Sequence, residues 1–299
     1  MMLGKLKIGY FADGPWSHNA LDKLLHDETL EVEFVCARND APDPILREKT
    51  DNSGIDFIIS SNINSDAFLA KMKIYNCDIF VSMSFNQIFH SRLINLPTLK
   101  TINCHAGKLP FYRGRNILNW ALINDEKEFG ITTHFVDEGI DTGDIILQNC
   151  YLISDDDNYF TLLQRAYKEC ANNIYEAIKI VQRGSVELTK QNDIDPLGFY
   201  CTARKVGDEV LDWHQTSREV FNFVRGISRP GPEARAYVRD VEVKINSVEY
   251  LQNAKKYKGI VGSVVGVGES YFHVKTFDSF IKVTDWSGYL RPRIGDRFK

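Results

Sequence analysis

The run CDIFVSMS, residues 77–84, constrains the fold most, because its apolar residues Ile79, Phe80 and Val81 follow one another without alternation. A strand with one wet face alternates apolar and polar residues, so such a run is typical of a central parallel strand covered on both faces. Residues 5–12 are a short apolar run, and residues 31–37, EVEFVCA, are expected to form a second strand. The segments PILREKTD and INSDAFLAKMKIY carry apolar residues at helical spacing. The pattern predicts an α/β domain with a parallel sheet.

The rest of the chain predicts further elements and a second module. Strands are expected at 101–105, 130–138 and 143–152, and helices at 115–125 and 159–182. From Lys190 the chain loses periodicity and carries Pro196 and Gly198, which indicates a linker. A helix and closely spaced short strands then suggest a β-rich module. We therefore predict a catalytic domain over residues 1–185, a linker over 186–204 and an OB-like domain over 205–299.

Composition and charge exclude several classes of protein. The 299 residues are 43% apolar and 25% charged, as in a soluble globular protein. No apolar run approaches the ~20 residues that span a bilayer, and the N-terminus lacks the features of a secretion signal. The six scattered cysteines form no CxxC pair, so neither a metal site nor a disulfide framework is expected. The net charge of −4 suggests no general electrostatic attraction to nucleic acid. We expect a cytoplasmic protein.

The turn after the first strand is a candidate anion site. Residues 13–25, DGPWSHNALDKLL, suggest a tight turn at Gly14 and Pro15 followed by a helix capped by Ser17. Such a turn aims free backbone N–H groups at an anion, such as a pyrophosphate. The alternative is an ordinary connection between strand and helix. Trp16 could stack on a base or sugar, or simply pack.

The stretch 101–148 holds the residues that suit catalysis. Asn103 and His105 are two residues apart in the strand TINCH, so their side chains share one face. An imidazole can accept a proton near neutral pH, and an amide can donate to a developing oxyanion. Asp141 lies in the turn EGIDTGD, which can bring its carboxylate back over the strand end to orient the imidazole.

This set suits direct acyl transfer to an amine, because a substrate that brings its own nucleophile needs no Ser or Cys from the enzyme. Alternation turns Cys104 to the opposite side of the strand. Each residue has a structural alternative: a strand His is often a packing residue, and Asn103 or Asp141 could bond local backbone. The three together, with their flanking glycines, favour a catalytic site.

The motifs NCHAGKLPFYRG (103–114) and DEGIDTGDII (137–146) resemble those of the formyltransferases that use N10-formyltetrahydrofolate. The resemblance implies a Rossmann-like N-terminal domain in which Asn103, His105 and Asp141 are catalytic. The substrate amine would attack the formyl carbon, and Asn103 would hold the oxyanion. His105 would accept the amine proton or stabilise the oxyanion as imidazolium, and Asp141 would tune His105 and help relay the proton. Residues 212–238 resemble the segment that opens an OB-like C-terminal domain in the longer members.

The same resemblance implies where the folate co-substrate lies, and no metal is implied. The expected contacts, largely through backbone groups, come from two loops: Phe85, Asn86, Gln87 and Ile88 in the first, and Asp137, Glu138, Gly139 and Ile140 in the second.

The acceptor expected from the resemblance is a nucleotide-linked amino sugar, with a dTDP-linked 4-amino-4,6-dideoxyhexose favoured. The spelling YRGRNILNWA (112–121) is closer to the sugar-modifying branch than to the tRNA branch. Expected substrate contacts are Gly14, Trp16, Ser17, Arg113 and Arg115, although Arg113 could instead hold its loop. A homodimer is expected because dimers are common in that branch. Three alternatives stay open: a methionyl-tRNA formyltransferase, a formyltetrahydrofolate hydrolase, and a catalytically silent binding protein.

Overall fold

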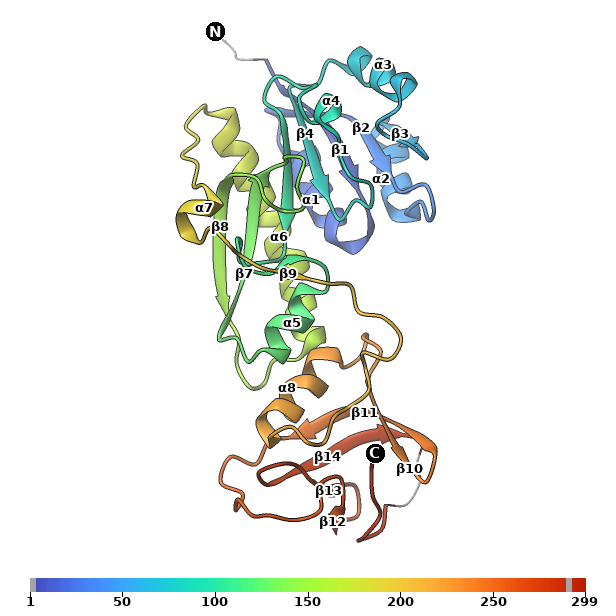
Figure 1. Ribbon diagram of the computed structural model, residues 1–299. Helices are drawn as coiled ribbons and strands as arrows, with labels where there is room; N and C mark the ends of the chain where they lie inside the picture. Colours follow the sequence, from blue (N-terminus) through green and yellow to red (C-terminus); the bar gives the residue numbers. More distant parts are fainter. Residues whose placement is uncertain (1–3, 289–291) are drawn as a thin grey trace. The chain divides into compact units, whose positions relative to one another are not determined.

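The computed structural model describes residues 4–288 and 292–299, which group into two compact units (Figure 1). The first unit comprises Met1–Gly114, Gly130–Tyr151 and Gln164–Tyr200, and the second comprises Arg115–Phe129, Leu152–Leu163 and Cys201–Lys299. In these described ranges, none of the helices has both the length and the apolar character needed to cross a membrane. Residues 1–3 and 289–291 lie outside the described residues. Residues 1–3 belong to the N-terminal stretch that was expected to lack a secretion signal.

A seven-stranded sheet forms the first unit, in the order β3-β2-β1-β4-β5-β7-β8. Its strands are β1 (Leu6–Ala12), β2 (Leu30–Ala37), β3 (Asp56–Ile59), β4 (Ile79–Met83), β5 (Thr101–His105), β7 (Glu128–Phe135) and β8 (Ile145–Leu152). The first five of these pair in parallel, and β7 pairs antiparallel with β5. All five residues of β4 are buried, which confirms the central parallel strand predicted from its apolar run.

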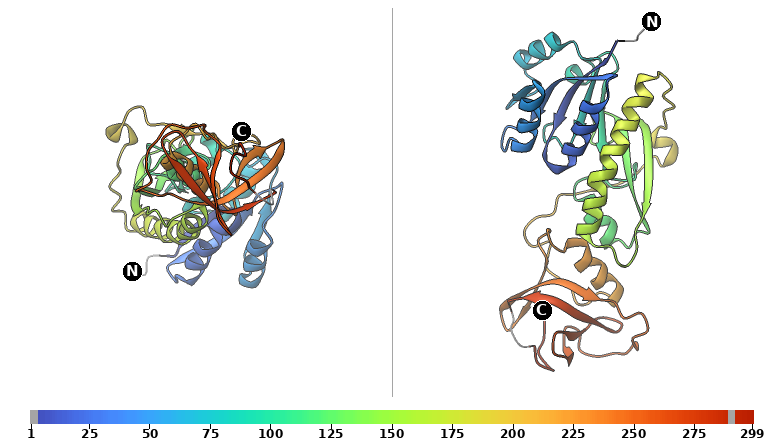
Figure 2. Two further views of the ribbon diagram at one scale, coloured as in Figure 1. Left: turned by 90° about the horizontal axis from the view of Figure 1, so that it is seen from below. Right: turned by 180° about the vertical axis from the view of Figure 1, so that it is seen from behind.

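Helices cover the sheet and bury its aromatic core. They are α1 (Gly14–His26), α2 (Pro44–Ser53), α3 (Asp66–Tyr75), α4 (Ser91–Ile94) and α6 (Tyr159–Gln182). Phe11, Phe34 and Phe80 contact one another edge to face between the sheet and α3. The view from behind in Figure 2 shows α6 running along β7 and β8. The Sγ of Cys104 donates to the carbonyl of Cys170 on α6, which confirms that Cys104 faces away from the Asn103 side.

The second unit is β-rich, as predicted. Its antiparallel sheet has the order β10-β11-β14-β13-β12, and helix α8 (Ser217–Ile227) begins with a capping box between Thr216 and Glu219. The strands are β10 (Ala234–Val238), β11 (Val241–Glu249), β12 (Val264–Val267), β13 (Phe272–Lys275) and β14 (Phe280–Ser287). Helix α5 (Ile117–Ile123) also belongs to this unit.

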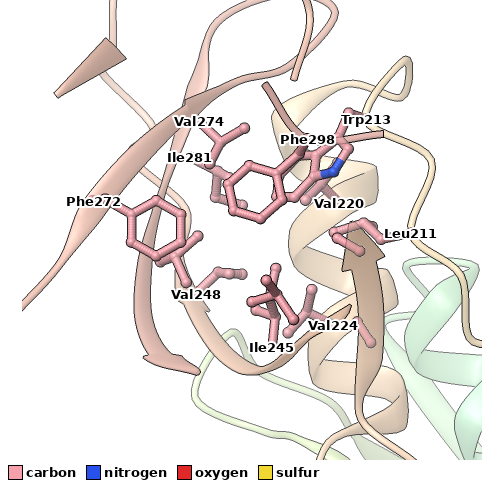
Figure 3. Packing of buried hydrophobic residues seen from close by; sticks show 14 of the residues in the cluster. Leu211, Trp213, Val220, Val224, Ile245, Val248, Phe272, Val274, Ile281 and Phe298 are labelled. Carbon is pink, nitrogen blue, oxygen red and sulfur yellow. The ribbon is translucent and has the colours of Figure 1, made fainter. Parts of the chain in front are cut away.

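The C-terminal segment joins the two edges of this sheet. Phe298 bridges Val238 at the end of β10, and Arg297 bridges Ser263 just before β12. Figure 3 shows the Phe298 ring in the core, between Trp213 and Phe272. Because both edges pair with one segment, the sheet closes on itself as a small barrel does.

The structure differs from the sequence predictions in three local details. The prediction that Ser17 caps a helix is wrong: α1 begins at Gly14 with Asp13 at the N-cap position, because Pro15 fits the first turn of a helix. The helix expected at 115–125 is shorter, at Ile117–Ile123. The segment interpreted as a linker contains α7 (Gln191–Ile194) and β9 (Tyr200–Cys201), and β9 pairs with β6 (Arg113–Gly114).

Candidate active site

Asn103 and His105 share one face of β5 with two residues of β7. In the antiparallel register Asn103 lies opposite His134, and His105 lies opposite Thr132. Directly opposed residues point to the same side of a sheet. The pairing therefore brings a second histidine to the face that carries the two predicted catalytic side chains.

His105 lies between two oxygen acceptors. Its Nε2 is 2.7 Å from the carbonyl oxygen of Tyr112, and its Nδ1 is 3.5 Å from Oδ2 of Asp141. Only an imidazole that carries both protons can donate to both oxygens at once. Gly107 makes this close approach possible, because a Cβ there would lie 2.5 Å from Nε2 of His105 and 2.6 Å from the Tyr112 carbonyl.

The Asp141 carboxylate reaches back to the strand ends. The backbone N–H of Gly114 donates to its Oδ2 at 2.9 Å, and its Oδ1 lies 3.6 Å from Nε2 of His134. Burial alone would raise the pKa of Asp141, but His105, His134 and the Gly114 N–H together hold that pKa well below its usual range. Asp141 is therefore an anion beside two imidazoles.

His134 holds the amide of Asn103. Its Nδ1 lies 2.7 Å from the carbonyl oxygen of Phe135, and because a carbonyl can only accept a hydrogen bond, Nδ1 carries a proton and donates to it. Its Nε2 lies 3.3 Å from Nδ2 of Asn103, and in the neutral ring, whose one proton is on Nδ1, this nitrogen accepts a hydrogen bond from that amide. The side chain of His134 is only 3% exposed. The second amide hydrogen of Asn103 remains available to bind an oxyanion.

The two predicted arginine contacts have different surroundings. Arg113 is buried, and its Nε and Nη2 donate to Oε1 of Gln191 at 3.0 and 2.8 Å. Its guanidinium is thus engaged in holding its loop, which was the alternative considered for it. Arg115 is exposed, so its substrate contact stays a prediction.

The first loop predicted to bind folate, residues 85–88, follows β4. Phe85 packs against Phe11 with ring centroids 5.6 Å apart, and Gln87 bonds Ser60 and Ile63 with its side-chain amide. Asn86 donates to Asp40, while Ile88 is 60% exposed. The loop thus presents one exposed apolar side chain, Ile88, and its folate contacts stay a prediction.

The second predicted folate loop, residues 137–140, is exposed. Asp137 accepts from the Thr142 hydroxyl at 2.6 Å and from the Gly139 N–H at 3.1 Å. Glu138 lies on the exposed side of the turn, and Ile140 is 53% exposed. Both loops thus present an exposed isoleucine, although their folate contacts stay a prediction.

The predicted anion turn is less open than expected. Ser17 is fully buried and donates to the carbonyl of Gly14 at 2.8 Å, which leaves its side chain no exposed surface for a ligand. The Asp13 carboxylate precedes α1 and pairs with Arg38 at 3.2 Å. Trp16 is partly exposed and packs edge to face on Tyr167 at 4.7 Å. Gly14 and Trp16 remain candidates for substrate contacts.

Sequence reasoning missed His134, Gln191 and the Tyr112 carbonyl. The alternation of GITTHFVDE was visible, but which face His134 takes depends on the register of β7 against β5. Gln191 lay in a segment without periodicity, where no sequence pattern marks a buried side chain. In the part of the chain that the structure describes, no three His, Cys, Asp or Glu side chains are grouped to hold a metal ion.

The arrangement can stabilise negative charge on a carbonyl oxygen and move a proton. Asn103 supplies an amide donor, His105 supplies an imidazole that can accept or release a proton, and the Asp141 carboxylate lies beside that imidazole. These are the requirements of acyl transfer through a tetrahedral intermediate.

Family models match both parts of the chain. Residues 10–178 match the model described as formyl transferase. Residues 205–287 match the model described as formyl transferase, C-terminal domain.

Curated relatives and a solved structure extend the comparison. The methionyl-tRNA formyltransferase of Azobacteroides pseudotrichonymphae is 36% identical over 72% of this chain and 68% of its own length. That of Halothermothrix orenii is 29% identical over 98% of this chain and 96% of its own. The crystal structure of WlaRD, a sugar 3N-formyl transferase in the presence of dTDP and 5-N-formyl-THF, has a TM-score of 0.71 at 24% identity, covering 96% of this chain and 100% of that one. At that identity the likeness establishes the fold alone.

Proposed function

Because the chain belongs to the formyl transferase family, we propose that it transfers a formyl group from a formyl-tetrahydrofolate to a primary amine. The observation that carries the proposal is the contact of His105 with the Asp141 anion on the face shared by Asn103. The folate donor is supported by the motif resemblance. It is also supported by WlaRD, a protein of the same fold whose crystal structure is in the presence of 5-N-formyl-THF.

In this mechanism the acceptor nitrogen attacks the formyl carbon while the bond from that carbon to N10 of the folate is still intact. The oxyanion that develops accepts the second N–H of Asn103. As the intermediate collapses, the C–N10 bond breaks, and the proton lost by the amine ends on N10. His105 is the group placed to pass that proton, and Asp141 stabilises its charged form.

For the acceptor we propose the amino group of methionyl-tRNA first. The support is the relative from Halothermothrix orenii, which covers both parts of the chain. The distribution of charge also supports a tRNA acceptor. Residues 205–299 hold 16 Lys and Arg against 12 Asp and Glu, although the whole chain has a net charge of −4. A basic module suits a polyanion.

The second candidate acceptor is the nucleotide-linked amino sugar expected from the sequence. The observation that favours it is the amino-acid sequence of residues 112–121, which resembles that of the sugar-modifying formyltransferases. A nucleotide sugar needs only local contacts, for which Trp16 and the exposed Arg115 are candidates.

One assay separates these acceptors. Purified protein and N10-formyltetrahydrofolate are incubated with initiator methionyl-tRNA, with a panel of amino-sugar nucleotides, or with no acceptor, and the mass gain of one formyl group is followed. Formylation of the tRNA alone supports the first proposal, and formylation of a sugar alone replaces it with the second. Donor turnover that ignores every acceptor identifies a hydrolase, and no turnover at all overturns the catalytic proposal.

A further inference from the structure

Gln191 is a buried polar cross-link next to the site. It is 3% exposed and begins α7, in the segment between the two predicted domains. Its Oε1 accepts two bonds from Arg113, at 3.0 and 2.8 Å. Its Nε2 donates to the carbonyls of Asp141 and Gly143, each at 2.8 Å. The partners fix the orientation of the amide, since a guanidinium can only donate and a carbonyl can only accept.

The cross-link joins the two segments that support the catalytic residues. On one side it holds the backbone of the turn that carries Asp141. On the other it holds Arg113, which directly follows Tyr112, and the Tyr112 carbonyl is the acceptor for His105. The Gln191 side chain therefore connects two segments that contact His105. One carries the Tyr112 carbonyl, which faces Nε2, and the other carries the Asp141 carboxylate, which faces Nδ1.

The Asp141 turn requires such support because its backbone is strained. Asp141 has a φ of +54°, which L-residues rarely adopt. A Cβ at Gly143 would lie 1.8 Å from the Phe135 carbonyl, so the turn passes very close to the end of β7. Thr189, two residues before Gln191, pairs with Ile145 through bonds of 2.8 and 3.0 Å. The segment 189–191 thus fastens the turn where it enters β8.

We propose that Gln191 is a positioning residue that sets the distance between the Asp141 carboxylate and His105. The proposal rests on the formyl transfer proposed above, because it assigns that carboxylate a catalytic role. Gln191 itself contacts backbone and Arg113, so its effect reaches the reaction through Asp141. The donor and the acceptor are expected to bind elsewhere on the site.

The test is Gln191→Glu, which keeps the length of the side chain and its bond to Arg113. A carboxylate cannot donate to the Asp141 and Gly143 carbonyls, and its oxygen would repel them. We expect kcat to fall at least tenfold while KM for N10-formyltetrahydrofolate stays within twofold. We also expect the amide hydrogens of residues 141–144 to exchange with solvent at least tenfold faster.

The matched control is Gln182→Glu. Gln182 also donates to a backbone carbonyl, that of Thr29 at 3.1 Å, but from the end of α6. We expect this control to keep kcat, KM and the exchange of residues 141–144. If Gln191→Glu does not fold, Gln191→Asn decides the question, because it keeps the amide but is too short to make all four hydrogen bonds.

The outcomes are distinct. A Gln191 variant with kcat within twofold of the wild type and unchanged exchange at 141–144 overturns the proposal. Equal losses in the Gln182 control also overturn it, since they would indicate general destabilisation. If the wild-type protein formylates nothing, the proposed function fails, whereas the exchange measurement still reports whether Gln191 holds the turn.

Discussion

Asp141 is the residue whose charge the site depends on. Burial opposes its ionisation, but His105, His134 and the Gly114 N–H outweigh burial and lower its pKa. Because the pKa of Asp141 is lower in the folded protein, the ionised carboxylate stabilises the fold fully when the pH is above the pKa of the unfolded chain, ~3.9. This stabilisation is lost as the pH falls through the lower pKa of the folded protein. Asp141 therefore stays ionised throughout the neutral range, and the acid limb of a rate profile must come from another group.

We predict that Asp141→Asn lowers kcat by roughly 10²–10⁴-fold, the usual range for losing a proton-transfer partner. Asn has the same shape but removes the negative charge that lies beside His105. Steady-state kinetics measures the effect, and far-ultraviolet circular dichroism checks the fold. A variant that keeps a normal kcat would remove Asp141 from the catalytic set.

We predict a smaller effect at His134. His134→Phe keeps a ring but leaves the Asn103 amide without its acceptor, so kcat should fall about tenfold, as expected for one oriented hydrogen bond. His134→Gln restores an acceptor and should recover part of the loss. Kinetics of the two variants at saturating donor measures this. Equal rates in both would argue against a role in orienting Asn103.

These residues show how far sequence reasoning extends. The shared face of Asn103 and His105 follows from alternation within one strand, so it could be predicted. His134 reaches the same face through pairing between strands 31 residues apart, and the register of that pairing is set by packing. Gln191 was missed for the same reason, because its partners lie 48 to 78 residues away.

At the scale of elements, apolar patterns predicted the sheet and the β-rich module, while helix starts were less predictable. Ser17 looked like a cap, yet the helix begins earlier because Gly14 adopts a positive φ and Pro15 fits the first turn. The buried strand β4 had no such ambiguity, since four of its five residues are apolar and all five are buried. Local caps compete with one another over a few residues, whereas a buried run has one natural place in an α/β sheet.

Within the second unit, an ion cluster ties α8 to the end of α5. Arg218 on α8 donates to Asp125 at 3.1 Å through Nε and to Asp155 at 2.7 Å through Nη1. Burial acts to raise the pKa of Asp125, but bonds from Arg218 and Lys127 lower it to about 2. The Asp125 side chain is 35% exposed, so solvent screens much of this interaction.

We predict that Asp125→Asn lowers the free energy of unfolding by about 1 kcal/mol at pH 7. Because the folded pKa is lowered, the wild-type advantage should be complete above pH ~4 and disappear as the pH falls towards ~2. Urea denaturation over this range measures it. Asp240→Asn, at an exposed turn between β10 and β11, is the control and should change stability by less than about 0.5 kcal/mol. A pH-independent difference would contradict the assignment.

At the scale of the whole molecule, the overall charge of −4 obscured the basic module that the chain contains. Residues 1–204 hold 20 Lys and Arg, and residues 205–299 hold 16, although the second range is less than half as long. Lys255, Lys256 and Lys258 are exposed around Tyr257, whose ring lies 4.6 Å from Nζ of the buried Lys275. We define these three lysines as the basic loop. A polyanionic acceptor should use it, and a nucleotide sugar should not.

We predict that replacing all three lysines of the basic loop by Glu raises KM for methionyl-tRNA at least tenfold at ~0.1 M salt and leaves kcat nearly unchanged. Each phosphate contact adds roughly 0.7 to 0.9 to the slope of log affinity against log salt, so three lost contacts should reduce that slope by about 2 to 3. The control is Lys71→Glu with Lys73→Glu, two exposed lysines of α3. If the basic-loop variant formylates a nucleotide sugar normally and tRNA is not a substrate of the wild type, the loop has no part in acceptor binding.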